Sequence, residues 1–184
     1  MKSIVIAAAL VVASAGFAWA QHGHPTHLAP APYAGFQERP IKALSAQQIA
    51  DLKAGRGMGL ALAAELNGFP GPLHVLELAA GLELTGEQRR KVEGLFADMK
   101  SEAVPVGQRL IDQEADLDRQ FAGRTITPDS LAAGTQAIGV TQGALRNVHL
   151  KYHLATLAVL TPEQVARYTS LRGYAASGPH RGHH

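Results

Sequence analysis

The stretch Leu84-Thr85-Gly86-Glu87-Gln88 recurs twice in this chain, as Leu44-Ser45-Ala46-Gln47-Gln48 and as Leu160-Thr161-Pro162-Glu163-Gln164. Each copy has Leu, then Ser or Thr, and then Gln three residues after the hydroxyl residue. This spacing is typical of a capping box, in which the hydroxyl accepts from the third helical amide while the Gln side chain bonds back to the cap. Each copy therefore predicts the start of a helix immediately after its Ser or Thr.

Apolar residues follow the second copy at spacings of three and four, which predicts a long amphipathic helix of about 35 residues from Gln88 onward. The predicted inner stripe is Val92, Phe96, Met99, Ala103, Val106, Leu110, Leu117 and Phe121. Pro105 lies inside this helix and is expected to kink it or split it in two. Gly123 is expected to end it.

A second long helix is predicted from Pro128 to about Val159, because Thr127 can cap it and proline is favoured at the first helical position. Its predicted inner stripe is Leu131, Ile138, Leu145, Val148, Tyr152 and Ala155. The short turn between the two long helices predicts a helical hairpin.

Shorter helices are expected on both sides of this hairpin, over residues 45–53, 57–67, 72–80 and 162–172. Glycine and proline separate them, and Gly173 can end the last one. No segment alternates polar and apolar residues with period two over a useful length, so strands are not expected. The predicted fold class is all-α, a long-helix hairpin with short flanking helices.

The N-terminus is predicted to be a secretory signal peptide over residues 1–20. An apolar run from Ile4 to Val12 follows Met1-Lys2, and Ala18-Trp19-Ala20 provides a cleavage site. Cleavage near Ala20 would deliver the protein to the periplasm, with no later segment apolar enough to span a membrane. Residues 21–43 and 174–184 are expected to be disordered, His-rich tails, which leaves residues 44–173 as a single domain.

Composition and motifs argue against several classes of protein. Lys and Arg number 17 against 15 Asp and Glu, and such a balanced charge does not favour a nucleic-acid partner. The chain has no cysteine, so disulfides and thiolate metal sites are not available. Nucleophile elbows, zinc-protease motifs, phosphate loops and dinucleotide fingerprints are absent from the sequence. We therefore expect no enzyme activity and no organic cofactor.

Histidines are the candidate metal ligands. His149 and His153 stand four residues apart on the second long helix, so both imidazoles project from one face and can bind the same divalent ion. Further ligands could come from the short helices upstream, where His74, Glu77 and Glu65 are in reach and Met58 would suit a softer metal. Six of the nine histidines lie in the tails and could bind metal weakly.

A structural role is the alternative for His149 and His153. In that interpretation the two rings lie at the edge of the core and form hydrogen bonds with nearby carboxylates.

With its signal peptide, His-bearing N-terminus, helical hairpin and repeated motif, the chain resembles the periplasmic LTxxQ-motif family. This family includes Spy/CpxP-type chaperones, zinc-resistance-associated proteins and CnrX-type heavy-metal sensors. The resemblance extends from Ser45 to Gly173 and implies an all-α fold in which hooked hairpins pair into a cradle-shaped dimer. In the metal-sensing branch, histidine stands on the helix before the last motif copy, where His149 and His153 stand here. His74 has no match in the family motif.

Two functions are thus predicted. The first is a periplasmic, metal-responsive stress protein, a sensor or buffer, that binds zinc, nickel, cobalt or copper through His149, His153, His74 and Glu77. The second is an ATP-independent chaperone, a holdase for unfolded proteins, in which the histidines are structural. Expected partners are a second copy of the chain and either unfolded clients or a membrane-bound regulator. A metal could shift such a dimer between states only through a difference in affinity.

Overall fold

The computed structural model describes residues 31–174, and from Gly35 onward these belong to one compact unit. Within the described residues the structure is entirely helical, which confirms the predicted all-α class. None of the helices in this range is long and apolar enough to cross a bilayer. The predicted signal peptide, residues 21–30 of the predicted N-terminal tail and the C-terminal tail after Tyr174 lie outside the described residues. The rest of the predicted N-terminal tail is partly ordered, because Phe36–Glu38 form a short 3-10 helix and Ile41 is buried, so the domain begins before Leu44.

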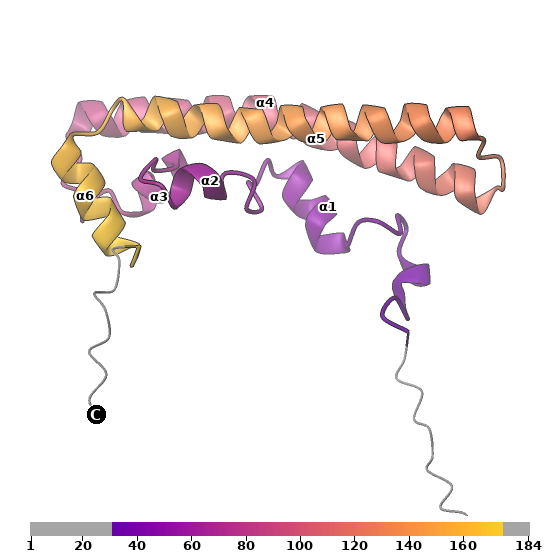
Figure 1. Ribbon diagram of the computed structural model, residues 1–184. Helices are drawn as coiled ribbons and strands as arrows, with labels where there is room; N and C mark the ends of the chain where they lie inside the picture. Colours follow the sequence, from indigo (N-terminus) through magenta and orange to yellow (C-terminus); the bar gives the residue numbers. More distant parts are fainter. Residues whose placement is uncertain (1–30, 175–184) are drawn as a thin grey trace, which may run out of the picture. The chain divides into compact units, whose positions relative to one another are not determined.

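Two long helices form the predicted hairpin. Helix α4 (Gly86–Ala122) and helix α5 (Pro128–Leu157) run antiparallel and lie side by side along most of their length (Figure 1). Helix α4 continues through Pro105, so the expected split does not occur. Proline removes one hydrogen bond from a long helical ladder, and the packing of α4 against α5 supports the helix on both sides of that gap.

The main core lies between the hairpin and helix α1 (Ala46–Lys53). Its buried members come from the inner stripes of the three helices and from the segment just before α1: Ile41, Leu44, Leu52, Met99, Ala103, Leu110, Ile111, Ile138, Leu145, Val148 and Tyr152. Phe121 and Leu131, both predicted in the stripes, are exposed instead. They lie next to the turn that joins α4 to α5, where each helix end has fewer neighbours to cover it.

A second, smaller core joins helix α3 (Pro72–Glu77) and helix α6 (Pro162–Leu171) to the start of α4. Its fully buried residues are Val75, Leu82, Val92 and Tyr168. Two helices upstream are shorter than predicted. Helix α2 spans only Leu62–Glu65, because Met58 and Gly59 adopt positive φ angles of 44° and 83° that a helix cannot contain, and α3 ends at Glu77.

All three copies of the repeated motif form complete capping boxes, at α1, α4 and α6. The last two copies also meet in space. Gln88 Nε2 donates to Gln164 Oε1 at 2.8 Å, and Gln164 Nε2 donates to Gln88 Oε1 at 3.0 Å. The same two amides donate to the Val159 and Leu82 carbonyls, so each Gln caps its own helix and holds the other motif copy.

Helix α1 packs closely against α4 at Gly107. A Cβ atom on this residue would stand 2.6 Å from the Leu52 carbonyl oxygen, which is backbone and cannot rotate away. Only glycine therefore fits at this position without moving the α1 backbone. A Cβ atom on Gly94, also on α4, would meet no atom within 4 Å.

We expect Gly107→Ala to lower the free energy of unfolding by about 1–3 kcal/mol, because α1 must move away from α4. Gly94→Ala is the matched control and should raise it by about 0.5–1 kcal/mol, since alanine loses less backbone entropy in a helix. Urea unfolding followed by circular dichroism measures both. Two variants of equal stability would contradict the close contact.

Candidate metal centre

A cavity of about 470 Å³ lies between the hairpin helices α4 and α5 and the segment that runs from Ala54 through α2 and α3. Its wall contains three of the predicted ligands, His149, His153 and His74. The wall also contains Glu65 and Met58, which the sequence placed in reach of the histidines.

His149 is the most deeply buried of these groups, with 3% of its surface exposed. Burial lowers the pKa of its imidazole, and the neighbouring His153 ring lowers it further, so the ring is neutral at physiological pH. Its Nε2 atom is buried and has no hydrogen-bond partner among residues 31–174. In the tautomer protonated at Nδ1, this unpartnered Nε2 carries the lone pair and can donate it to a metal.

His153 lies one turn further along α5 and is held by the backbone. Its Nδ1 is 2.6 Å from the Phe69 carbonyl oxygen. A carbonyl can only accept, so Nδ1 carries the proton and, in the neutral ring, Nε2 keeps its lone pair. Metal-binding histidines are typically fixed by such a bond from the other ring nitrogen. Gly71 packs against the ring, since a Cβ there would stand only 2.9 Å from Nε2.

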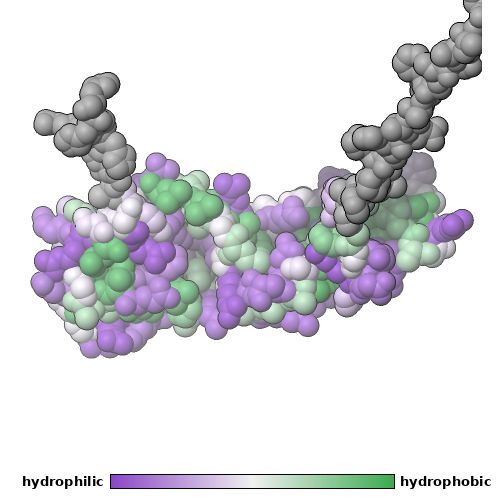
Figure 2. Space-filling model, turned by 90° about the horizontal axis from the view of Figure 1, so that it is seen from below, coloured by the Kyte–Doolittle hydropathy of each residue, from purple (hydrophilic) through white to green (hydrophobic). Residues whose placement is uncertain are grey.

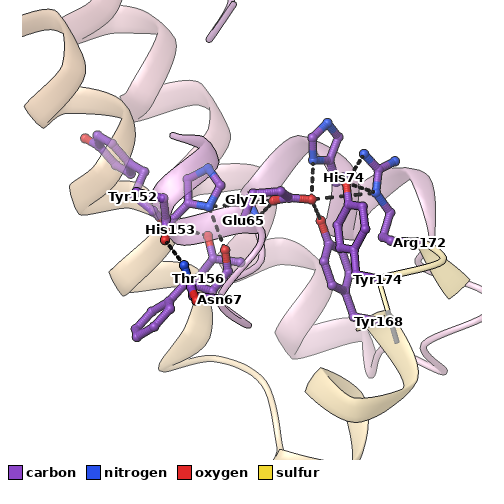
Figure 3. A network of polar contacts seen from close by, with 12 residues as sticks. Glu65, Asn67, Gly71, His74, Tyr152, His153, Thr156, Tyr168, Arg172 and Tyr174 are labelled. Atoms are coloured by element: carbon purple, nitrogen blue, oxygen red, sulfur yellow. Dashed lines mark hydrogen bonds and ion pairs between the residues drawn. The ribbon is translucent and has the colours of Figure 1, made fainter. Parts of the chain in front are cut away.

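Glu65 supplies the buried carboxylate of the cavity (Figure 3). It accepts hydrogen bonds from His74 Nδ1 at 3.1 Å, from the Gly71 amide at 3.3 Å and from the Tyr168 hydroxyl. Arg172 Nε lies 3.6 Å from the same carboxylate. Burial alone would raise the pKa of Glu65, but the bonds from His74 and Tyr168 outweigh it and lower the pKa to about 2. The carboxylate is therefore ionised and surrounded by donors.

The structure brings three of the four predicted ligands, His74, His149 and His153, to one cavity, but not Glu77. Glu77 is exposed at the end of α3 and is not part of the cavity wall. The acidic residue in the wall is Glu65, and the sequence carried a signal for it. Glu65 is the only acidic residue between Arg56 and Glu77, and an isolated charge in an apolar segment needs partners if it is buried.

The two α5 histidines make up the donor set that best fits a metal ion. No group of three or more His, Asp or Glu side chains within residues 31–174 has the arrangement that would hold one outright. Two imidazole rings one helical turn apart, one with a buried ring nitrogen that lacks a partner and one fixed by a carbonyl, supply two of the ligands that a transition metal would need.

Comparisons with known proteins give no further guide. No protein-family model, curated protein or solved structure matches this chain. The resemblance to the LTxxQ-motif family therefore rests on the repeated motif, the hairpin and the position of the two histidines.

Glu65→Gln keeps the shape of the side chain but removes the charge that His74, Tyr168 and Arg172 surround. We expect it to lower the free energy of unfolding by about 2 kcal/mol, the range for hydrogen bonds to a charged group. Glu77→Gln, at an exposed carboxylate of α3, should change it by less than about 0.5 kcal/mol. Chemical denaturation measures both, and a Glu65→Gln protein as stable as the control would show that the network contributes little.

Proposed function

We propose that this chain is a non-enzymatic, metal-responsive protein of the periplasm that binds a divalent transition metal as a sensor or buffer. The observation that carries the proposal is the His149 side chain, which is buried, neutral and without a partner for Nε2, one turn from a His153 ring fixed by the Phe69 carbonyl.

The chemistry of the unpartnered nitrogen supports this proposal. A buried polar atom that lacks a hydrogen bond costs about 1–3 kcal/mol, and a metal ion that accepts the lone pair would remove that cost. Imidazole nitrogen suits zinc, nickel, cobalt and copper. When bound, the metal would supply a positive charge shared by the two rings. His74, whose Nδ1 is taken by Glu65, is the third ligand we propose, through its Nε2.

The position of the cavity supports a sensor. His149 and His153 belong to the hairpin, whereas Phe69 and His74 belong to the chain around α2 and α3, which Glu65 connects to α6. A metal held by both parts would favour the state in which the short helices are docked on α5. We propose a second copy of this chain and a membrane-bound regulator as the partners that would respond to this change.

Calorimetric titration of the protein with zinc, nickel, cobalt and copper tests the structured site. The His149→Ala/His153→Ala variant retains the tail histidines, so it should bind one metal ion fewer than the wild type. Metal at about a hundredfold excess over Kd should stabilise only the wild type, by roughly 2.7 kcal/mol in thermal unfolding. Light scattering of the same samples measures whether the chain is dimeric and whether metal changes its mass. Equal binding and equal stabilisation of both proteins would rule out the site.

An ATP-independent holdase is the second candidate, supported by the exposed apolar side chains of the α2–α3 segment. Leu62, Leu66 and Leu73 are 54%, 57% and 41% exposed. Figure 2 shows hydrophobic residues in separate patches, with hydrophilic residues between them, on the face that carries the short helices. Weak apolar patches bordered by polar groups suit transient capture of unfolded chains.

The metal-free protein should suppress aggregation of a thermally unfolding test protein at equimolar ratio. Leu62→Gln/Leu66→Gln should reduce that suppression, because both side chains leave the apolar surface that a client would contact. Val140→Gln removes an exposed apolar residue of α5 and serves as the control. If the control loses as much suppression as Leu62→Gln/Leu66→Gln, this surface is excluded. It is also excluded if the wild type does not suppress aggregation even at several-fold excess.

A further inference from the structure

The cavity beside His149 and His153 is much larger than a metal ion requires. Its volume is about 470 Å³. A water molecule occupies about 30 Å³, so an ion that completes its shell with a few waters would use only part of this space. Cavities of about 300–1,000 Å³ are typical of sites for small organic molecules. The size therefore indicates a second ligand, and the wall indicates its chemistry.

Apolar side chains make up much of the wall. Phe96 and Met99 project from α4, and Leu73 and Pro72 from α3. Gly57 and Gly71 also border the cavity, and the rings of His149 and His153 pack against these two glycines. Such a wall fits the body of an apolar or aromatic molecule.

The charged groups of the wall are mostly cations. Glu65 is the one carboxylate in the wall, and its oxygens already have donors from His74, Gly71 and Tyr168. Arg56 is also in the wall, but its guanidinium is already paired at 2.7 Å with Asp51, a residue outside the wall.

Two cations in the wall retain free donors. Lys100 makes no ion pair with any residue from 31 to 174, and its ammonium lies 5.8 Å from the centroid of the Phe96 ring in the same wall. Arg172 uses Nε and Nη2 on the Tyr174 hydroxyl, and Nη1 has no hydrogen-bond partner among the described residues. An anion that enters this cavity would find donors without displacing any existing bond.

We propose that the cavity binds a small organic carboxylate, with its apolar part against Phe96 and Met99 and its carboxylate paired with Lys100. Arg172 Nη1 is the second donor in the wall that such a ligand could reach. Binding of this ligand needs no bound metal ion and so does not depend on the proposed metal site.

Fluorescence of anilinonaphthalene sulfonate, an amphipathic anion that brightens in apolar surroundings, reports on the cavity of the metal-free protein kept in chelator. Phenylbutyrate and phenylbutanol are a matched pair of competitors that differ in the charged group. We expect phenylbutyrate to displace the probe at concentrations at least about threefold lower than phenylbutanol, and higher salt should reduce this difference.

Lys100→Gln should weaken binding of phenylbutyrate about two- to fivefold, the range for a solvent-exposed ion pair, and leave phenylbutanol unchanged. Lys91→Gln, which removes a lysine of α4 that pairs with Glu87, is the control and should change neither. Wild-type protein in chelator carries no metal and should still bind phenylbutyrate, so failure of the metal site and failure of this site are separate results. Equal displacement by the two competitors, or an equal effect of the two lysine variants, would overturn the proposal.

Discussion

The buried Glu65 carboxylate is the constraint on which this end of the molecule depends. An ionised carboxylate with 5% of its surface exposed is stable only if donors surround it. Those donors come from three places, His74 on α3, the Gly71 amide before it, and Tyr168 on α6. The same requirement fixes the path of the chain between α2 and α3, and this path brings the Phe69 carbonyl to His153. The charge of Glu65 thereby helps to position the carbonyl that holds His153.

Helix starts could be predicted from the sequence because capping is local. The hydroxyl and the amide of each motif copy act on backbone groups within three residues, so the pattern alone specifies the bond. The inner stripes of α4 and α5 could be predicted for a similar reason, since helical periodicity places them on one face whatever they pack against. The prediction failed where context decides. Of the two outcomes expected at Pro105, a kink or a split, the split did not occur, and the segment around α2 formed turns at Met58 and Gly59.

The candidate site shows the same division. His149 and His153 could be found because their spacing on a helix fixes their common direction. Glu65 has the sequence signal of an isolated charge in an apolar segment, but Glu77 lay equally within reach, and only the packing of α2 and α3 decides which one faces the cavity. The carbonyl bond of His153, the unpartnered nitrogen of His149 and the cations Lys100 and Arg172 are likewise consequences of contacts between distant segments.

By itself, the sequence determined the all-α class, the capped starts of α1, α4, α5 and α6 and the pairing of two histidines on one helical face. These features follow from bonds and periodicities that span a few residues. The tertiary structure alone decided that Gln88 and Gln164 hold each other's motif, that Glu65 is buried among donors, and that the histidines border a cavity. These outcomes depend on which surfaces meet when helices far apart in the chain bury their apolar faces, and no local pattern encodes that choice.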